Sequence, residues 1–419
     1  MPRTSALREL YDADSLDFPT KRAVRMSEKS LDEKGGKMVT VRPGSHVYRL
    51  ISILGITGEY PMRSLHLIGY ARVMRTLVHR LTFPQTMRNS NTDERLTTKL
   101  LLITGRGSLK SIRLYKGALP ILEWIHPNLC GYYKRAFWNH HFPGDAAHRD
   151  RNLRVAEAVA ICMAAGIEVW PYMLPQLQNT MIELTVSERP SFYLARDIKK
   201  INPSEQNKTI FTRHAGAILS QNSCYVVYNT RNAVMKWNGM GEFKALHSII
   251  ELARMNAGLL SVDSAILFGE SEQTALKTLL ESDKHRRLEF RFDGIYRHVH
   301  FIPLNSNGIR LLRMLVLSDW NEAILDLLFD PDTRSQNRGS FEYDAFVDGV
   351  YVYQHLSGDL ARLIRFREGI LYGAEKCEVI CFPDQVPLLR EYLGSQVSLK
   401  TIELNLLERE LGIGKKVIE

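Results

Sequence analysis

A glycine-rich turn between two strand-forming stretches, "KLLLITGRGSLKSIRLYKG" (99–117), limits most strongly what this chain can fold into. The β-branched and aliphatic residues on both sides of "TGRGS" predict a two-stranded hairpin. The hairpin contains no acidic residue, and its basic residues after the first strand are Arg106, Lys110, Arg113 and Lys116. Hairpins that only complete a core usually carry mixed charges for solubility. The purely basic charge of this hairpin therefore indicates a role beyond completing the core.

Three short helical segments precede the hairpin. Residues 45–57 place apolar residues at i, i+3, i+4 and i+7, and Ser45 is suited to cap this helix. Further helices are expected over residues 62–69 and 70–82, with Pro84 ending the third. Three short helices followed by a two-stranded hairpin is the element order of a winged helix-turn-helix, in which the hairpin is the wing.

The third helix separates apolar from basic side chains. Its apolar residues recur at helical spacing along one face, and they are Met74, Leu77, Val78 and Leu81. Its basic residues lie opposite or beside that face, and they are Arg72, Arg75, His79 and Arg80. We expect these four to meet the major groove of double-stranded DNA. The wing would contact phosphates through Arg106, Lys110 and Arg113.

The positive charge of the chain is concentrated in its N-terminal third. Residues 1–154 contain 26 Lys and Arg against 13 Asp and Glu, a balance of +13. The whole chain carries +9, so the remaining residues have a balance of −4. Such asymmetry indicates a polyanionic partner for the N-terminal third, most often a nucleic acid.

The pattern along the chain predicts an α+β fold in three parts. Residues 1–42 are polar and predict a flexible arm, residues 43–150 a winged-helix domain, and residues 151–419 a mixed-sheet α/β domain. The third part contains a hairpin–helix–strand unit twice, beginning near residues 215 and 343. We interpret this repetition as a structural duplication without sequence identity.

The repeated unit is similar to the core of restriction-endonuclease-like nucleases. Those sites need an acidic residue on one strand and an Asp/Glu-x-Lys motif on the next, so that two carboxylates hold Mg²⁺ beside a lysine. Asp344 could supply the first acid, but the strand that follows it, "VYVYQHL", has no Asp/Glu-x-Lys motif, and neither has "CYVVYNT" in the first unit. The duplication is therefore expected to be degenerate, without a nuclease site.

An alternative enzyme function depends on "RHVHFIPLN" (297–305). On a strand, His298 and His300 point to the same face and could share a Mg²⁺ or Mn²⁺ ion. This His–hydrophobe–His spacing is similar to that of DNA-nicking relaxases, which also use a tyrosine nucleophile; Tyr296 is the nearest one. No third ligand stands at a useful spacing, so we expect ordinary packing and hydrogen bonding for the pair.

Three stretches of the chain resemble the replication-relaxation family, found on plasmids and integrative elements of Gram-positive bacteria. They are "LITGRGSLKSIRLYKGALPIL" (102–122), "TRHAGAILSQNSCYVVYNTRNAVMKW" (212–237) and "FEYDAFVDGVYVYQHLSGDLARL" (341–363). The resemblance covers most of the chain beyond residue 45. It implies an N-terminal winged helix and a role in replication or relaxation of mobile DNA, but it supplies no catalytic residue.

These observations favour a DNA-binding protein of a mobile element, acting in replication initiation or in DNA relaxation and mobilisation. We expect a cytoplasmic bacterial homodimer that acts with other replication or relaxosome proteins, without a cofactor and without a membrane anchor. The five cysteines are expected to be buried free thiols. A metal-dependent nickase using His298 and His300 is one alternative. A winged-helix transcriptional repressor is the other.

Overall fold

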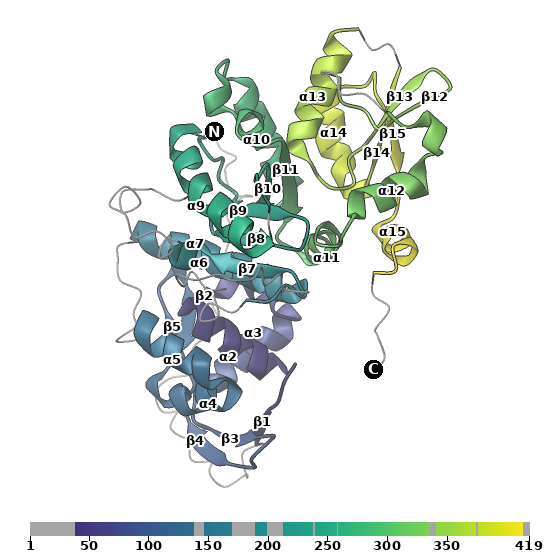
Figure 1. Cartoon of the computed structure of the whole chain (residues 1–419). Helices are drawn as coiled ribbons and strands as arrows, with labels where there is room; N and C mark the ends of the chain where they lie inside the picture. Colours follow the sequence, from purple (N-terminus) through teal and green to yellow (C-terminus); the bar gives the residue numbers. More distant parts are fainter. Residues whose placement is uncertain are drawn as a thin grey trace, which may run out of the picture.

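The computed structural model describes residues 38–137, 146–169, 189–198, 213–237, 239–257, 259–335, 341–373 and 376–413. Figure 1 shows a mixed α/β protein in which helices flank several sheets. The described residues form two three-stranded sheets near the N-terminus, followed by a five-stranded and a four-stranded sheet. The mixed α/β class expected from the sequence is confirmed.

The first part of the chain folds into three short helices where the sequence predicted them, and the second of these is a 3₁₀ helix. Ser45 accepts a hydrogen bond from the Tyr48 N–H, and Gly58, with φ 78°, ends the first helix. The strand that follows pairs with the second strand of the predicted hairpin. The elements are α2 (His46–Thr57), β2 (Glu59–Pro61), η1 (Met62–Leu67) and α3 (Ala71–Leu81).

The predicted hairpin at residues 99–117 is confirmed. Strands β5 (Leu101–Thr104) and β6 (Ser111–Leu114) pair antiparallel, and β2 lies on the other side of β6. The turn between them contains η2 (Gly107–Leu109). At Gly105, φ is 75° and a Cβ atom would stand 2.3 Å from the Leu109 carbonyl oxygen, so only glycine fits there.

A second small sheet in this region was not expected. Strand β1 (Val39–Val41) runs parallel to β3 (Gln85–Asn89), which pairs antiparallel with β4 (Arg95–Thr98). Residues 39–41 therefore do not belong to an arm, and the expected boundary at residue 42 is wrong. The remainder of that arm, residues 1–37, lies outside the described residues.

A long helix joins the N-terminal elements to the first large sheet. Helices α4 (Leu119–Ile125) and α5 (Pro127–Ala136) pack on α2, and α6 (Ala146–Ala164) follows. Helix α6 contacts α2, β2 and η1 on one side and strand β9 (Cys224–Arg231) on the other. The expected domain boundary at residue 150 therefore falls inside a helix that both parts share.

The first large sheet has the strand order β11-β10-β9-β8-β7. Its outer pairs, β7–β8 and β8–β9, are antiparallel, whereas β9, β10 and β11 run parallel. Residues of β9 alternate between two hydrophobic clusters, with Val227 facing the N-terminal elements and Val226 facing away. The elements are β7 (Ser191–Leu194), α7 (Ala195–Ile198), β8 (Gly216–Leu219), β9, α9 (Gly239–Ala257), β10 (Ser264–Gly269), α10 (Glu272–Asp283) and β11 (His298–Pro303).

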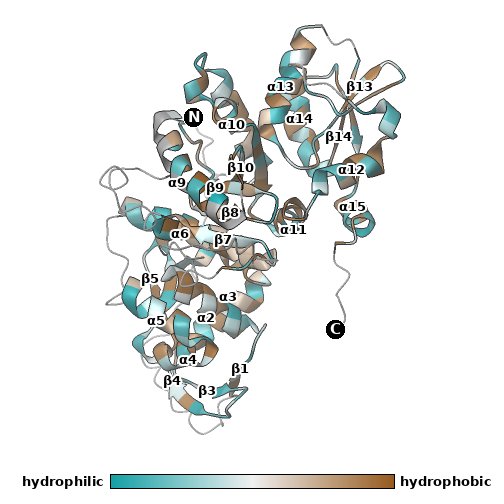
Figure 2. Cartoon of the chain, viewed as in Figure 1, coloured by the Kyte–Doolittle hydropathy of each residue, from teal (hydrophilic) through white to brown (hydrophobic). Residues whose placement is uncertain are grey.

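The second large sheet repeats this topology. Its order is β12-β13-β14-β15, with an antiparallel hairpin followed by parallel strands, so the predicted hairpin–helix–strand unit occurs twice. Figure 2 shows hydrophobic strands between helices that carry both hydrophobic and hydrophilic residues. The elements are α11 (Ser306–Leu315), α12 (Trp320–Leu328), β12 (Ala345–Val347), β13 (Val350–Gln354), α13 (Leu360–Leu371), β14 (Cys377–Cys381), α14 (Val386–Leu393), β15 (Ser398–Thr401) and α15 (Leu404–Glu410).

Two further expectations concern cysteines and membranes. All five cysteines are buried thiols, as expected. Among the described helices, none is both long and apolar enough to cross a bilayer.

Candidate functional site

Helix α3 presents a basic face to solvent and buries the opposite one. The Met74, Val78 and Leu81 side chains are fully buried in the N-terminal core. On the other face, the exposed basic side chains are Arg72, Arg75 and His79, with Val73 and Thr76 exposed between them. This separation follows directly from the 3.6-residue period of the sequence.

Arg80 occupies a different position from the other three predicted groove residues. Its side chain is half-buried, and its Nε donates a 2.8 Å hydrogen bond to Gln85 Oε1 at the start of β3. Arg80 therefore links α3 to the small sheet instead of extending the exposed face. The His79 ring stays outside, in contact with the Phe83 ring at 5.4 Å between centroids.

The turn of the β5–β6 hairpin exposes two of its three predicted phosphate contacts. Arg106 and Lys110 are exposed. Arg63 of η1 holds the turn in place, because its Nη1 donates a 2.8 Å hydrogen bond to the Ser108 carbonyl. Arg113, by contrast, is half-buried and stands opposite the buried Glu59 in the β2–β6 ladder. This position suits support of the hairpin better than direct contact with DNA.

The unexpected β3–β4 hairpin adds further cations, but an acidic residue in its turn pairs with them. Asp93, with φ 60°, forms ion pairs with Arg88 and with Arg95, the latter at 3.7 Å. The positive charges of the β3–β4 hairpin are thus partly neutralised by Asp93. Among the described residues, no Asp or Glu forms an ion pair with the exposed basic side chains of the α3 face or of the β5–β6 turn.

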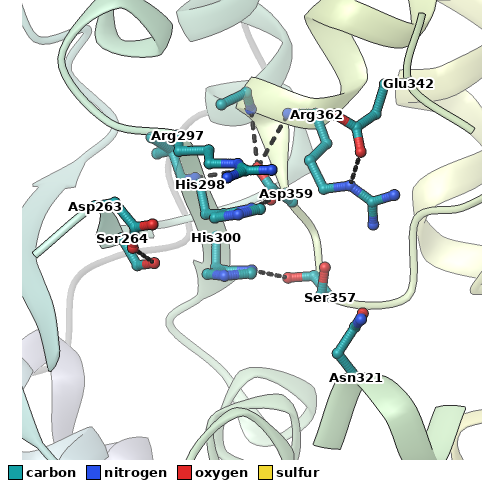
Figure 3. Close-up of polar contacts among 12 residues, drawn as sticks. Asp263, Ser264, Arg297, His298, His300, Asn321, Glu342, Ser357, Asp359 and Arg362 are labelled. Carbon is teal, nitrogen blue, oxygen red and sulfur yellow. Dashed lines mark hydrogen bonds and ion pairs between the residues drawn. The ribbon is translucent and has the colours of Figure 1, made fainter. Parts of the chain in front are cut away.

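The predicted histidine pair lies where the two large sheets meet (Figure 3). His298 and His300 project from one face of β11, as predicted, and their rings stack with centroids 6.2 Å apart. His298 Nδ1 donates a 2.7 Å hydrogen bond to Asp359 Oδ2. Asp359 precedes α13, in the second unit, so this pair joins the two units directly.

Asp359 is held as a buried carboxylate by several donors. Besides His298, it accepts hydrogen bonds from the backbone N–H groups of Val299, Ala361 and Arg362 at 3.0–3.2 Å. Burial alone would raise the pKa of Asp359, but the His298 hydrogen bond and nearby positive charge hold it below its usual value. The carboxylate thus caps α13 and orients the His298 ring.

His300 is buried as a neutral imidazole. Its Nδ1 donates to the Ser357 carbonyl at 3.2 Å, and the Tyr225 and Trp320 rings stand edge-on to it. Burial lowers the pKa of His300 to about 4, despite the attraction of the nearby Asp359 charge. Packing and hydrogen bonding therefore engage this side chain, as expected from the sequence.

The described residues contain no group of three His, Cys, Asp or Glu side chains that could hold a metal ion. Asp359 approaches His298 as an orienting acid, through Nδ1, and not as a third ligand beside both rings. Tyr296, the expected nearest nucleophile, is buried elsewhere, with its hydroxyl 2.8 Å from that of Tyr228. Sequence reasoning missed Asp359, because it lies 61 residues from His298.

Asp344, the candidate first acid of the second unit, has a structural role. It is buried, and its carboxylate accepts hydrogen bonds from Arg362 Nη2 at 2.8 Å and from the Gln354 N–H at 2.7 Å. Burial raises the pKa of Asp344, although Arg362 opposes this rise. The expected absence of an Asp/Glu-x-Lys motif on the next strand leaves it without a catalytic partner there.

Comparisons with known proteins give no match to this chain. No protein-family model matches it, and neither the curated proteins nor the solved structures contain a match. The geometry and charge of the described residues, with the sequence resemblance stated above, are therefore the basis for a functional proposal.

Proposed function

We propose that the N-terminal part of this protein is a winged helix-turn-helix that binds double-stranded DNA. The order α2–β2–η1–α3–β5–β6 supports this assignment, as does the sheet order β2-β6-β5, in which the strand after the first helix pairs with the hairpin. The Leu100 N–H donates to the Leu81 carbonyl at 3.1 Å, which joins the end of α3 to the first strand of the wing.

The single observation that carries the proposal is the exposed basic face of α3. Arg72, Arg75 and His79 are accessible on a helix whose opposite face is fully buried, the arrangement that a recognition helix requires. Arg106 and Lys110, exposed on the wing, would contact phosphates. Arg80 and Arg113 would then act indirectly, by holding α3 and the wing in position.

The biological context of this activity comes from the sequence resemblance. A member of the replication-relaxation group would act on the DNA of a plasmid or integrative element, in the bacterial cytoplasm. We propose that it does so as a homodimer in replication initiation or DNA relaxation, with other replication or relaxosome proteins. The two α/β units would be a degenerate restriction-endonuclease-like duplication, since Asp344 pairs with Arg362 and no Asp/Glu-x-Lys motif follows.

Binding of the full chain to fluorescent duplex DNA, followed by anisotropy over a range of salt concentrations, tests this function. We expect steep salt dependence and weaker binding after Arg75→Ala. The control is Arg409→Ala, which removes an exposed arginine on α15. Binding that is insensitive to salt, or equally weakened by both substitutions, would exclude α3 as the DNA contact.

A further inference from the structure

A cavity of about 410 Å³ lies beside α6, at the end of β9, outside the α3 face and the wing. Its walls are formed by residues from α6, from the segment before β8 and from the segment after β9. No Asp or Glu stands among the described residues that line the cavity. Its basic residues are His148, Arg151, Arg154, Arg213, His214 and Lys236.

The fixed positive charges of the cavity lie close to one another. Burial, and then the neighbouring Arg154 guanidinium, lower the pKa of Arg151. Arg213 donates a hydrogen bond to the Lys236 backbone carbonyl, which brings these two cationic residues together at the rim. Arg154 has an acidic partner within its own helix, Asp150, at 3.2 Å, and Arg213 lies close enough to Glu242 to attract its negative charge. An anion between these groups would relieve their mutual repulsion.

The remaining walls of the cavity are suited to an organic ligand. Val155, Val234 and Met235 supply apolar surface. Tyr228 also lines the cavity, and its hydroxyl donates a 2.6 Å hydrogen bond to Glu242. Asn229 is held rigidly, since its Nδ2 donates to the Arg154 carbonyl at 2.8 Å. The volume falls within the range of small-molecule sites, about 300–1,000 Å³.

A smaller cavity of about 230 Å³ adjoins the first, and its lining also contains basic residues. The two share five lining residues, among them His148, Arg151 and His214. The smaller cavity adds Arg196, and the described residues that line it again include no Asp or Glu. The combined space is larger than a simple inorganic anion needs.

We propose that this cavity binds the phosphate group of a small organic ligand of nucleotide size. Arginine forks match phosphate oxygens in paired hydrogen bonds, and Lys236 adds a point charge at the rim. The apolar wall would hold the organic part of the ligand. This inference is independent of DNA binding by α3, because the cavity contains none of the α3 or wing residues.

Isothermal titration calorimetry on the full chain tests the proposal, with ATP in EDTA, with pyrophosphate, and with a short duplex DNA. ATP should bind saturably, and pyrophosphate more weakly. Arg213→Gln combined with Lys236→Gln should weaken ATP binding about tenfold or more, because two charged contacts are lost. Arg409→Gln, on the exposed surface of α15, is the matched control and should leave ATP binding unchanged.

Three outcomes would overturn the proposal. They are the absence of saturable ATP binding, equal affinity in the double variant and the unaltered chain, and binding of duplex DNA alone with the same dependence on Arg213 and Lys236. Circular dichroism of the double variant checks that it folds, and both residues are exposed. Arg75→Ala should leave ATP binding intact, so failure of the DNA-binding function can be told apart from failure of this cavity.

Discussion

The Ser64 hydroxyl of η1 donates a 2.6 Å hydrogen bond to Glu157 Oε1, in the middle of α6. Glu157 is fully buried and also pairs with Arg63 at 3.5 Å and with Arg231 at 3.2 Å. Because Arg63 in turn holds the wing through Ser108, one carboxylate connects the wing, α6 and β9. Burial raises the pKa of Glu157, whereas the hydrogen bonds from Ser64 and Asn229 and the nearby Arg63 charge act in the opposite direction. This carboxylate is therefore the polar centre of the junction between the N-terminal elements and the first large sheet.

Glu157→Gln should destabilise the fold by about 3 kcal/mol, because it removes the buried anionic partner of Arg231 and leaves Arg63 with only its longer ion pair to Asp150. Urea-induced unfolding followed by circular dichroism measures this loss. Glu391→Gln, at an exposed position on α14, is the control and should change stability by less than about 0.5 kcal/mol. Equal stability of the two variants would show that the Glu157 charge contributes nothing at this junction.

Acidification should destabilise the contact between the two large sheets. Burial lowers the pKa of His300 and of His355 to about 4, below the 6.5 of an unfolded histidine. Between pH 6.5 and 4 the unfolded chain binds more protons than the folded chain. Stability is therefore fully present above pH 6.5 and falls as the pH is lowered toward 4, by about 3 kcal/mol for each histidine.

Unfolding by urea at several pH values between 4 and 7 measures this effect. His300→Asn should make the dependence on pH shallower, because one of the two titrating groups is removed. His247→Asn, at an exposed position on α9, is the control. An unchanged slope in His300→Asn would contradict the assignment of a buried neutral imidazole. Asp359, whose pKa is held below its usual value, loses its contribution only at lower pH.

Local patterns predicted the elements that local forces determine. The Ser45 cap and the apolar spacing predicted α2. The dipeptide Asp348-Gly349, a typical two-residue hairpin turn, likewise joins β12 to β13, and both of its residues have positive φ. The β1–β3–β4 sheet was missed because "QTMRN" shows no clear alternation of apolar residues. Only its partners across the sheet hold such a strand.

The residues that matter most at the junctions could not be predicted from spacing. Asp359 meets His298 across 61 positions, and Glu157 meets Ser64 across 93. In the sequence, Glu157 is one acidic residue within the apolar run of α6, and nothing nearby marks its partners. The cationic cavity is assembled from separate segments, so its charge becomes visible only in the fold.

Gly105→Ala should distort the wing, because a Cβ atom there would stand 2.3 Å from the Leu109 carbonyl oxygen. We expect a loss of about 1–3 kcal/mol in stability and weaker binding of any duplex DNA. Gly107→Ala is the matched control in the same turn, because its φ is also positive but no atom lies within 4 Å of the added methyl. Thermal unfolding measures the stability of both variants, and anisotropy measures their binding to duplex DNA. Equal effects at the two glycines would mean that the close contact at Gly105 does not shape the wing.

Substitutions on α3 and on the wing should differ in what they do to DNA recognition. Arg75 and His79 lie on the exposed helix face, so Arg75→Ala and His79→Ala should each weaken binding to the cognate site by about 1–3 kcal/mol more than binding to random DNA. Lys110, exposed on the wing, would contact only phosphate. Lys110→Ala should therefore weaken both kinds of binding equally and reduce the slope of log affinity against log salt by about 0.9. The cognate site is first obtained by selection from random duplexes, and affinities are then measured by anisotropy.

Identical behaviour of all three variants on cognate and random DNA would contradict the assignment of α3 to the groove. A basic surface that binds phosphates without sequence preference would then remain as the function of this face.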